Sequence, residues 1–158
     1  YAALLGVLSV FVVNSFIQVV NLYARARAER EALANARVVV ELVVKNVAQS
    51  QGVYAPTSRF NTDTGQLSLI TSATSTPGHT TSYIDFWTDG GVLMMRHEGG
   101  GTLALSAGSV RVTKFRLERI VQTIGREAVR MTIRADSASA KFPASVTLSA
   151  AAAIRGNY

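Results

Sequence analysis

The sequence predicts an α+β fold, in which one long N-terminal helix packs its second half on an antiparallel β-sheet and leaves its hydrophobic first half projecting. Three observations predict it. No charged residue occurs between Ala2 and Tyr23. A helical spacing of apolar residues continues after charges return at Arg25. The rest of the chain divides into short alternating segments separated by turn residues, a pattern typical of antiparallel strands.

The first half of the helix is long enough to cross a bilayer, since about 20 apolar residues rising roughly 1.5 Å each span the hydrocarbon core. We expect residues 1–24 to form a hydrophobic half-helix that lies in a membrane or in a filament core. A secretory signal peptide and an ordinary membrane anchor are the alternatives. The apolar run is longer than a typical signal core, and neither a loop nor a linker follows it, which opposes both.

The second half of the helix is amphipathic and begins the globular domain, which we place at residues 25–158. Its apolar residues recur at spacings of three and four and predict one buried stripe: Leu33, Ala36, Val40, Val43 and Val47. Gly52 is predicted to end the helix as a C-terminal glycine, and Pro56 prevents its continuation. The amphipathic half-helix therefore covers residues 25–51.

The sheet is predicted over residues 66–155. Gln66 to Thr71 reads as a first strand, and a polar connection follows from Ser72 to Thr80. Thr81 to Thr88 and Val92 to His97 form a hairpin, because Asp89-Gly90-Gly91 supplies positions that accept positive φ. A turn at residues 98–101 leads to another short strand over residues 102–106.

Three later segments complete the predicted sheet. Val110 to Ile120 has apolar residues of one parity before Thr113 and of the other parity after it, which indicates a switch of side through a bulge or bend. Ala128 to Ala135 alternates cleanly, with Arg130 and Arg134 facing away from the core. The last segment opens at Phe142-Pro143, and its alanine run, residues 150–153, is too close to Gly156 to form a helix.

The motif search finds little catalytic chemistry. The chain has no cysteine, which excludes disulfides, zinc thiolate sites and cysteine nucleophiles. His97-Glu98 and His79 lack a metal-binding partner at the required spacing, and Gly99 to Gly101 lacks the residues of a phosphate loop. The carboxylates are scattered along the chain without a convergent pair: Asp85, Asp89, Glu98, Glu118 and Glu127. We therefore expect no enzyme activity, no metal and no cofactor.

Basic residues gather within one stretch, 111–134, opposed there only by Glu118 and Glu127. The chain carries a formal charge of +6, and these side chains predict a contact with an anion such as DNA, with strong salt dependence. The alternative is a solvated sheet face, or a face that pairs with neighbouring subunits. The stretch also contains Arg119 and Arg126, but the candidate contact residues are Arg111, Lys114, Arg116, Arg130 and Arg134. Tyr83, Phe86 and Trp87 offer stacking surfaces for bases, although strand spacing favours core positions for them.

The stretch YAALLGVL and the longer text from VYAPTSRFNTDTGQLSLIT to FRLERI resemble the type IV pilin superfamily, which includes pilus subunits and the pseudopilins of type II secretion. The resemblance implies a pilin-like fold and a filament held together by its N-terminal helices. Aligning Gly6 with the glycine of the pilin pattern implies a short segment with a glutamate before Tyr1. Two departures stand out: Leu5 lies where the acidic residue would be if Tyr1 were the processed terminus, and no cysteine pair closes the C-terminal loop. The residues expected to pack in the filament core are Tyr1, Leu4, Leu5, Gly6, Leu8, Val12, Val13, Phe16, Ile17 and Val20.

The function implied is that of a structural subunit of an extracellular type IV pilus-like filament supporting adhesion or surface motility. The alternatives are a pseudopilin of a type II secretion-like machine and a minor DNA-capturing pilin. A membrane-anchored binding module and a periplasmic enzyme on a tether remain as further classes, but neither needs a seamless helix. The implied partners are copies of itself in a homopolymer, the inner membrane before assembly, the pilus assembly machinery and a prepilin peptidase; nucleic acid is a weaker expectation. The resemblance implies that the subunit is in the cytoplasmic membrane before assembly and at the cell surface, in the extracellular filament, afterwards.

Overall fold

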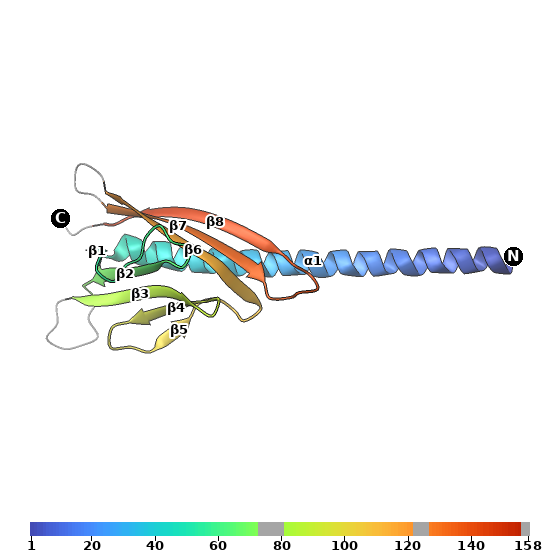
Figure 1. The fold of residues 1–158 in the computed structure, drawn as a ribbon, viewed down its shortest axis with the longest axis horizontal. Helices are drawn as coiled ribbons and strands as arrows, with labels where there is room; N and C mark the ends of the chain where they lie inside the picture. Colours follow the sequence, from blue (N-terminus) through green and yellow to red (C-terminus); the bar gives the residue numbers. More distant parts are fainter. Residues whose placement is uncertain (73–80, 122–126, 156–158) are drawn as a thin grey trace.

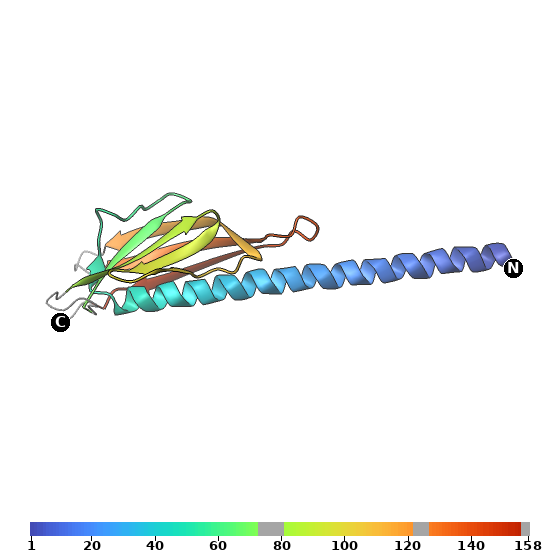
Figure 2. The same cartoon turned by 90° about the horizontal axis from the view of Figure 1, so that it is seen from below.

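The structure is a computed structural model that describes residues 1–72, 81–121 and 127–155 (Figure 1). One helix, α1 (Ala2–Gln49), is followed by eight strands in two antiparallel sheets. Both sheets lie on the same side of α1 and cover its C-terminal half, while the N-terminal half extends beyond them (Figure 2). The predicted α+β class and the projecting half-helix are confirmed. The predicted connection over 73–80, with His79, and the basic residue Arg126 lie outside the described residues.

Helix α1 runs without a break for 48 residues, or about 72 Å at 1.5 Å per residue. It ends at Ser50, whose backbone is extended and whose N–H and hydroxyl both donate to the carbonyl of Val47, at 3.2 and 2.8 Å. The prediction of a C-terminal glycine was therefore wrong: Gly52 begins strand β1 (Gly52–Val53). A serine that satisfies a terminal carbonyl removes the need for a left-handed residue there.

The buried stripe of α1 is centred on different residues from those expected. Ala36, Val43 and Val47 are buried as predicted, but Leu33 and Val40 are only half-buried. Ala32 and Val39 take their places, so the buried residues recur at spacings of four, three, four and four. The stripe packs mainly against strands β7 (Glu127–Ser137) and β8 (Ser145–Ala153).

The five-stranded sheet is an antiparallel meander in chain order. It contains β1 and four further strands: β2 (Gln66–Thr71), β3 (Ser82–Asp89), β4 (Val92–His97) and β5 (Thr102–Ala104). The predicted first strand and hairpin are confirmed, since Gly90 and Gly91 join β3 to β4 with φ of 57° and 84°. Two successive positive φ values give the turn whose twist matches a hairpin.

The three-stranded sheet has the order β6-β7-β8, where β6 is Val110–Val121. The register shifts between Val112 and Lys114, as a bulge would shift it, so the predicted irregularity near Thr113 is confirmed. Its effect differs from the expectation: Val112 and Phe115 are both buried, because the extra residue returns the second half of β6 to the same core face. The alanine run pairs with β7 as strand β8.

The prediction of one sheet is corrected to two sheets that share a core. Phe86, Leu67 and Leu69 from the first sheet and Phe115, Leu117 and Ile133 from the second belong to one buried cluster with the α1 stripe. The sheets are joined by an N–H of Val112 that donates to the carbonyl of Gly91 at 2.7 Å. The loop before β2 also reaches β6, where Gly65 donates to the carbonyl of Phe115 at 2.8 Å. A Cβ at Gly65 would lie 2.6 Å from that oxygen, so this approach requires glycine.

Candidate functional sites: the projecting helix and the arginine face

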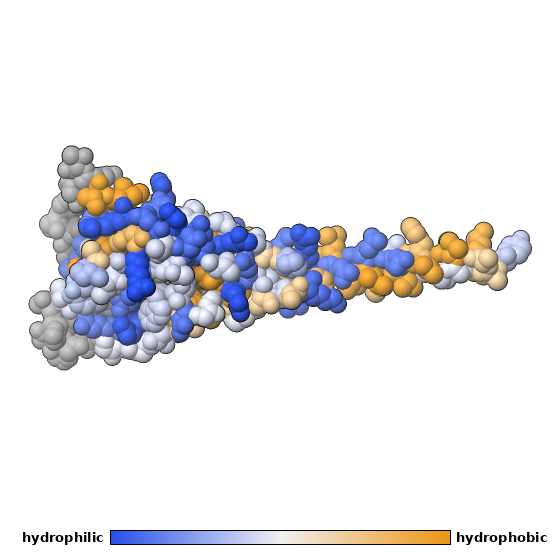
Figure 3. Space-filling view, viewed as in Figure 1, coloured by the Kyte–Doolittle hydropathy of each residue, from blue (hydrophilic) through white to orange (hydrophobic). Residues whose placement is uncertain are grey.

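The projecting half of α1 is apolar and uncovered. All ten residues predicted for a filament core lie on it or at its start and are exposed, and the nine with large side chains range from 49% at Val20 to 111% at Tyr1. Figure 3 shows this surface as the hydrophobic end of the molecule. Exposed apolar surface of this extent marks a site of contact with a membrane or with protein.

One window of α1 is long and apolar enough to cross a membrane, with a mean hydropathy of 2.2 over the window. The core helix of a soluble protein can have the same composition, but none of this window is buried within the chain. A signal segment near an N-terminus meets the same criterion. Length and composition therefore make α1 a candidate membrane span.

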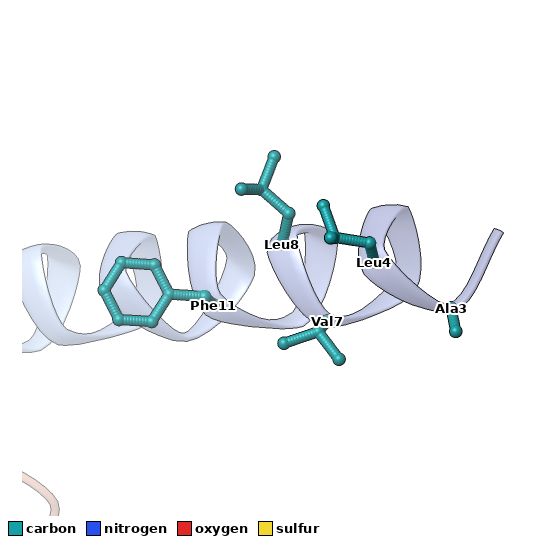
Figure 4. A pocket seen from close by; sticks show the side chains of 5 residues that line it. All are labelled: Ala3, Leu4, Val7, Leu8 and Phe11. Atoms are coloured by element: carbon teal, nitrogen blue, oxygen red, sulfur yellow. The ribbon is translucent and has the colours of Figure 1, made fainter. Parts of the chain in front are cut away.

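The apolar surface of the projecting half-helix contains a shallow hollow. Ala3, Leu4, Val7, Leu8 and Phe11 line an open hollow of about 520 Å³, and Figure 4 shows Leu4 and Leu8 pointing to one side of the helix. A single helix supplies only one wall, whereas sites for small molecules bury most of the ligand. The hollow suits the side chains of an adjacent helix, which insert between residues spaced by three and four.

A polar stripe on the same half-helix was missed by the sequence interpretation. Asn14, Gln18, Asn21 and Arg25 follow one another at spacings of four, three and four, which places them on one face. The last three, with Leu22, line a groove of about 520 Å³ whose other wall is the β7–β8 loop with Lys141, Phe142 and Pro143. The stripe therefore faces the side on which the sheets lie, and hydrophilic patches appear there on the projecting half (Figure 3). The spacing of these polar residues in the sequence would have been enough to identify the stripe.

The predicted anion-contact residues lie on β6 and β7. Lys114 and Arg134 are directly opposite in the register, Arg116 is the next outward residue on β6, and Arg130 lies two outward positions along β7, opposite Glu118. Arg111 precedes the bulge, and its side chain lies against the β3–β4 turn, where a Cβ at Gly91 would come 2.5 Å from its Cγ. The structure thus brings together four of the five predicted residues.

Arg119 is separated from that face. It follows the bulge with the parity of the buried residues Phe115 and Leu117, and it forms an ion pair with Glu127 at the end of the core face. Glu127 also accepts a 3.4 Å hydrogen bond from the backbone N–H of Val53. Glu127 therefore links β7 to β1 of the other sheet, and Arg119 pairs with it instead of contributing to an anion site.

The outward face is more acidic than the sequence interpretation assumed. Asp63 lies 3.3 Å from Lys114 and 3.7 Å from Arg116, and Asp136 lies 3.0 Å from Arg134. Glu118 lies 3.5 Å from both Arg116 and Arg130. Asp63 comes from a distant loop and Asp136 falls just past the basic stretch, so the count of acidic residues within the stretch, Glu118 and Glu127, did not include them. Lys114, Arg116, Arg130 and Arg134 exceed these three carboxylates by one positive charge, and Arg111, opposite Asp136 in the register, adds a second.

Asp136 is held in its ionised form. Desolvation alone would raise the pKa of its carboxyl, but the hydrogen bonds that it accepts from Arg134, Ser145 and Thr113 outweigh that effect. The positive charge of Arg134 acts in the same direction, so the pKa of Asp136 lies below its ordinary value of 3.8. The carboxylate therefore stays available to neutralise Arg134 at neutral pH.

The three aromatic residues considered for stacking are divided between two faces of β3. Phe86 is fully buried in the core, whereas Tyr83 and Trp87 are half-buried on the opposite face. Within residues 1–72, 81–121 and 127–155, no three histidine or carboxylate side chains converge as a metal-binding group.

Comparison with models of known protein families, with curated protein sequences and with solved structures finds no match. The fold and the exposed surfaces define the class of protein at a coarser level. It is an α+β domain built on the C-terminal half of a long helix, whose apolar N-terminal half projects from the domain.

Proposed function

We propose that this chain is the structural subunit of an extracellular type IV pilus-like filament and that it polymerises through residues 1–24. The observation that carries the proposal is the unbroken helix α1, which joins an uncovered apolar half directly to a folded domain. A tethered receptor or enzyme works equally well on a flexible linker. A polymer needs a fixed orientation between its packing helix and its outer domain.

The apolar surface of residues 1–24 is too large to remain in water, so lipid or protein must bury it. Fifteen large apolar side chains of residues 1–24 are exposed, and at about 1.5 kcal/mol each they amount to a cost on the order of 20 kcal/mol if they remain in water. A bilayer covers them before assembly, and identical helices cover them afterwards. The transfer between two apolar surroundings is nearly neutral, so helix packing decides the outcome.

The sidedness of α1 supports the same arrangement. The sheets lie on one side of α1 (Figure 2), and Gln18 and Asn21 face the β7–β8 loop on that side, with Asn14 following by helical spacing, which leaves the opposite side of the projecting half mostly apolar. A bundle that buries the apolar side turns both the stripe and the sheets outward. Because the helix projects from one end of the domain, contacts between copies are heterologous and generate an open helical polymer.

Two single-charge substitutions at the same depth in the helix test the proposal. Val12 and Asn14 are separated by about 200° around the axis, so Val12→Asp charges the apolar side and Asn14→Asp charges the polar side. We expect Asn14→Asp to retain filaments and Val12→Asp to lose them when the full chain is viewed by electron microscopy. Val12→Asp also carries the larger penalty for membrane insertion, because it replaces an apolar residue whereas Asn14→Asp replaces a polar one, so filament yield is compared per membrane-inserted subunit. Equal assembly of the two variants would contradict a helix bundle packed on the apolar side.

The biological role that we propose is adhesion or surface motility at the cell surface, after residence in the cytoplasmic membrane. Assembly machinery and a prepilin peptidase are the proposed partners. A pseudopilin of a secretion machine would use the same helix, and the length of the polymer distinguishes the two. DNA capture is the second candidate, supported by the outward face that carries Arg130 and Arg134 but weakened by its three carboxylates.

A further inference from the structure

A groove lies on the outer face of the five-stranded sheet, away from the arginine face and from the projecting helix. It has a volume of about 470 Å³, which is within the usual range of small-molecule sites. Three segments build it: the loop after β1, the outward side of β3, and β4 with the turn that follows. Its lining residues are Tyr54, Thr57, Tyr83, Asp85, Arg96, Glu98, Gly99 and Gly100.

Two tyrosine rings form one wall of the groove. The centroids of Tyr54 and Tyr83 are 5.0 Å apart and their planes are inclined by 60°, so they make a corner rather than a parallel stack. Both side chains are half-buried, and Tyr83 alternates with the buried Ser82 and Ile84 along β3. The strand therefore fixes the ring of Tyr83 on the surface, where it presents an apolar face.

The ion pair between Asp85 and Arg96 forms the polar part of the groove, and the buried Ser68 supports it from the core side. One carboxylate oxygen of Asp85 accepts a 2.6 Å hydrogen bond from the hydroxyl of Ser68, which is fully buried. The other lies 3.2 Å from a guanidinium nitrogen of Arg96. Arg96 also lies over the indole of Trp87, 5.8 Å from the ring centroid. The acceptor and the planar donor are thus oriented before any ligand arrives.

The rim of the groove is fixed by the backbone. Glu98 donates its N–H to the carbonyl of Tyr83 at 2.8 Å, and Gly100 donates to the carbonyl of His97 at 3.0 Å. Gly99 has a φ of 74°, which a residue with a Cβ rarely adopts. The turn therefore closes one end of the groove in a defined position.

We infer that this groove binds a neutral saccharide. Sugars combine an apolar face of C–H groups, which packs on a tyrosine ring, with adjacent hydroxyls that donate to a carboxylate and accept from a guanidinium. Asp85 and Glu98 outnumber Arg96 among the charged lining residues, which disfavours a polyanion. An apolar peptide would cover the Asp85–Arg96 pair and remove its contacts with water without offering a hydrogen bond in exchange. The inference concerns the folded domain and does not depend on the proposed filament, which would only multiply the site.

The test uses the full chain in a detergent without a sugar headgroup. Trp87 is the single tryptophan of the sequence and lies under Arg96, so its emission reports on the groove. Glucose, galactose, mannose, N-acetylglucosamine and their disaccharides are titrated, with glucuronic acid as the charged comparison. Saturation-transfer NMR of the same sugars provides a reading that is independent of Trp87. We expect saturable binding of at least one neutral sugar and weaker binding of glucuronic acid.

Three variants assign that binding to the groove. Tyr83→Phe keeps the ring and should retain affinity, whereas Tyr83→Ser should lose about tenfold or more. Arg96→Gln, a surface change, should weaken binding to a similar degree. Arg37→Gln on the exposed face of α1 is the matched control and should change nothing. The inference is overturned if no neutral sugar binds by either method, if glucuronic acid binds more tightly, or if Arg96→Gln binds as the wild type does. Loss of filaments in Val12→Asp leaves this titration unaffected, so the two proposals fail separately.

Discussion

Two valines of α1 allow the packing of helix on sheet to be measured directly. Val43 is 1% exposed in the core, whereas Val38 is 60% exposed on the same helix. Val43→Ala and Val38→Ala remove the same atoms from the same kind of backbone. Both variants also gain the same helix propensity, about 0.5 kcal/mol. The difference between their free energies of unfolding therefore isolates burial.

The expected difference is about 2 kcal/mol. Each buried methyl group contributes about 0.8 kcal/mol, so two give about 1.6 kcal/mol, and a partly collapsed cavity adds a few tenths. An exposed site such as Val38 changes stability by no more than about 0.5 kcal/mol. Val43→Asp should cost more than Val43→Ala, because the carboxylate has no buried partner.

Urea denaturation of residues 24–158, followed by circular dichroism and by the emission of Trp87, provides the measurement. A difference of about 2 kcal/mol corresponds to a fall in the melting temperature of roughly 6 to 10 °C for a domain of this size. Equal midpoints for Val43→Ala and Val38→Ala would refute the packing of α1 on β7 and β8.

Three further predictions concern assembly, acid stability and the arginine face. Deletion of residues 1–23 should give a soluble monomer by analytical ultracentrifugation, and filaments from that truncation would exclude the helix as the polymer core. Because the folded pKa of Asp136 is lowered, its stabilising contribution is complete above pH 3.8 and is lost as the pH falls further. Asp136→Asn should therefore flatten the dependence of stability on pH below 3.8 in acid titrations, and an unchanged slope would show that the network is not coupled to folding. Filament binding to DNA and to anionic glycans should weaken with salt and with Arg130→Ala plus Arg134→Ala; binding indifferent to both would leave the face a solvated surface.

Local patterns in the sequence were sufficient to predict where the helix and most strands lie. The continuation of the helix past Arg25, the Gly90-Gly91 turn and the change of parity near Thr113 each depend on neighbouring residues, and each was found where it was expected. Intrinsic periodicity determines these features before any tertiary contact forms. The alanine run from residue 150 was also assigned correctly to the sheet, since it pairs with β7 as the end of β8.

Features that depend on distant contacts could not be predicted in the same way. The division into two sheets follows from the pairing of strands, and alternation along one strand does not identify its neighbour. Asp63 reaches Lys114 from a loop far away in the chain, so a count of charges within the basic stretch could not include it. The Tyr54–Tyr83 corner likewise joins a loop to a strand. The candidate sites were therefore less predictable than the elements that carry them.

The saccharide groove and helix α1 lie on opposite sides of the five-stranded sheet, and this arrangement connects the proposed polymer with the proposed binding site. Tyr83 and Asp85 point away from the core that contains Phe86, and that core includes the buried stripe of α1. A bundle of α1 helices at the filament axis would consequently present the groove on the outside of every subunit. A single open groove of this volume binds a sugar weakly, but repeated copies on one filament increase the apparent affinity by about 10² to 10⁴ when they meet one extended polysaccharide. Display in many copies therefore compensates for a site that is too open to bind tightly by itself.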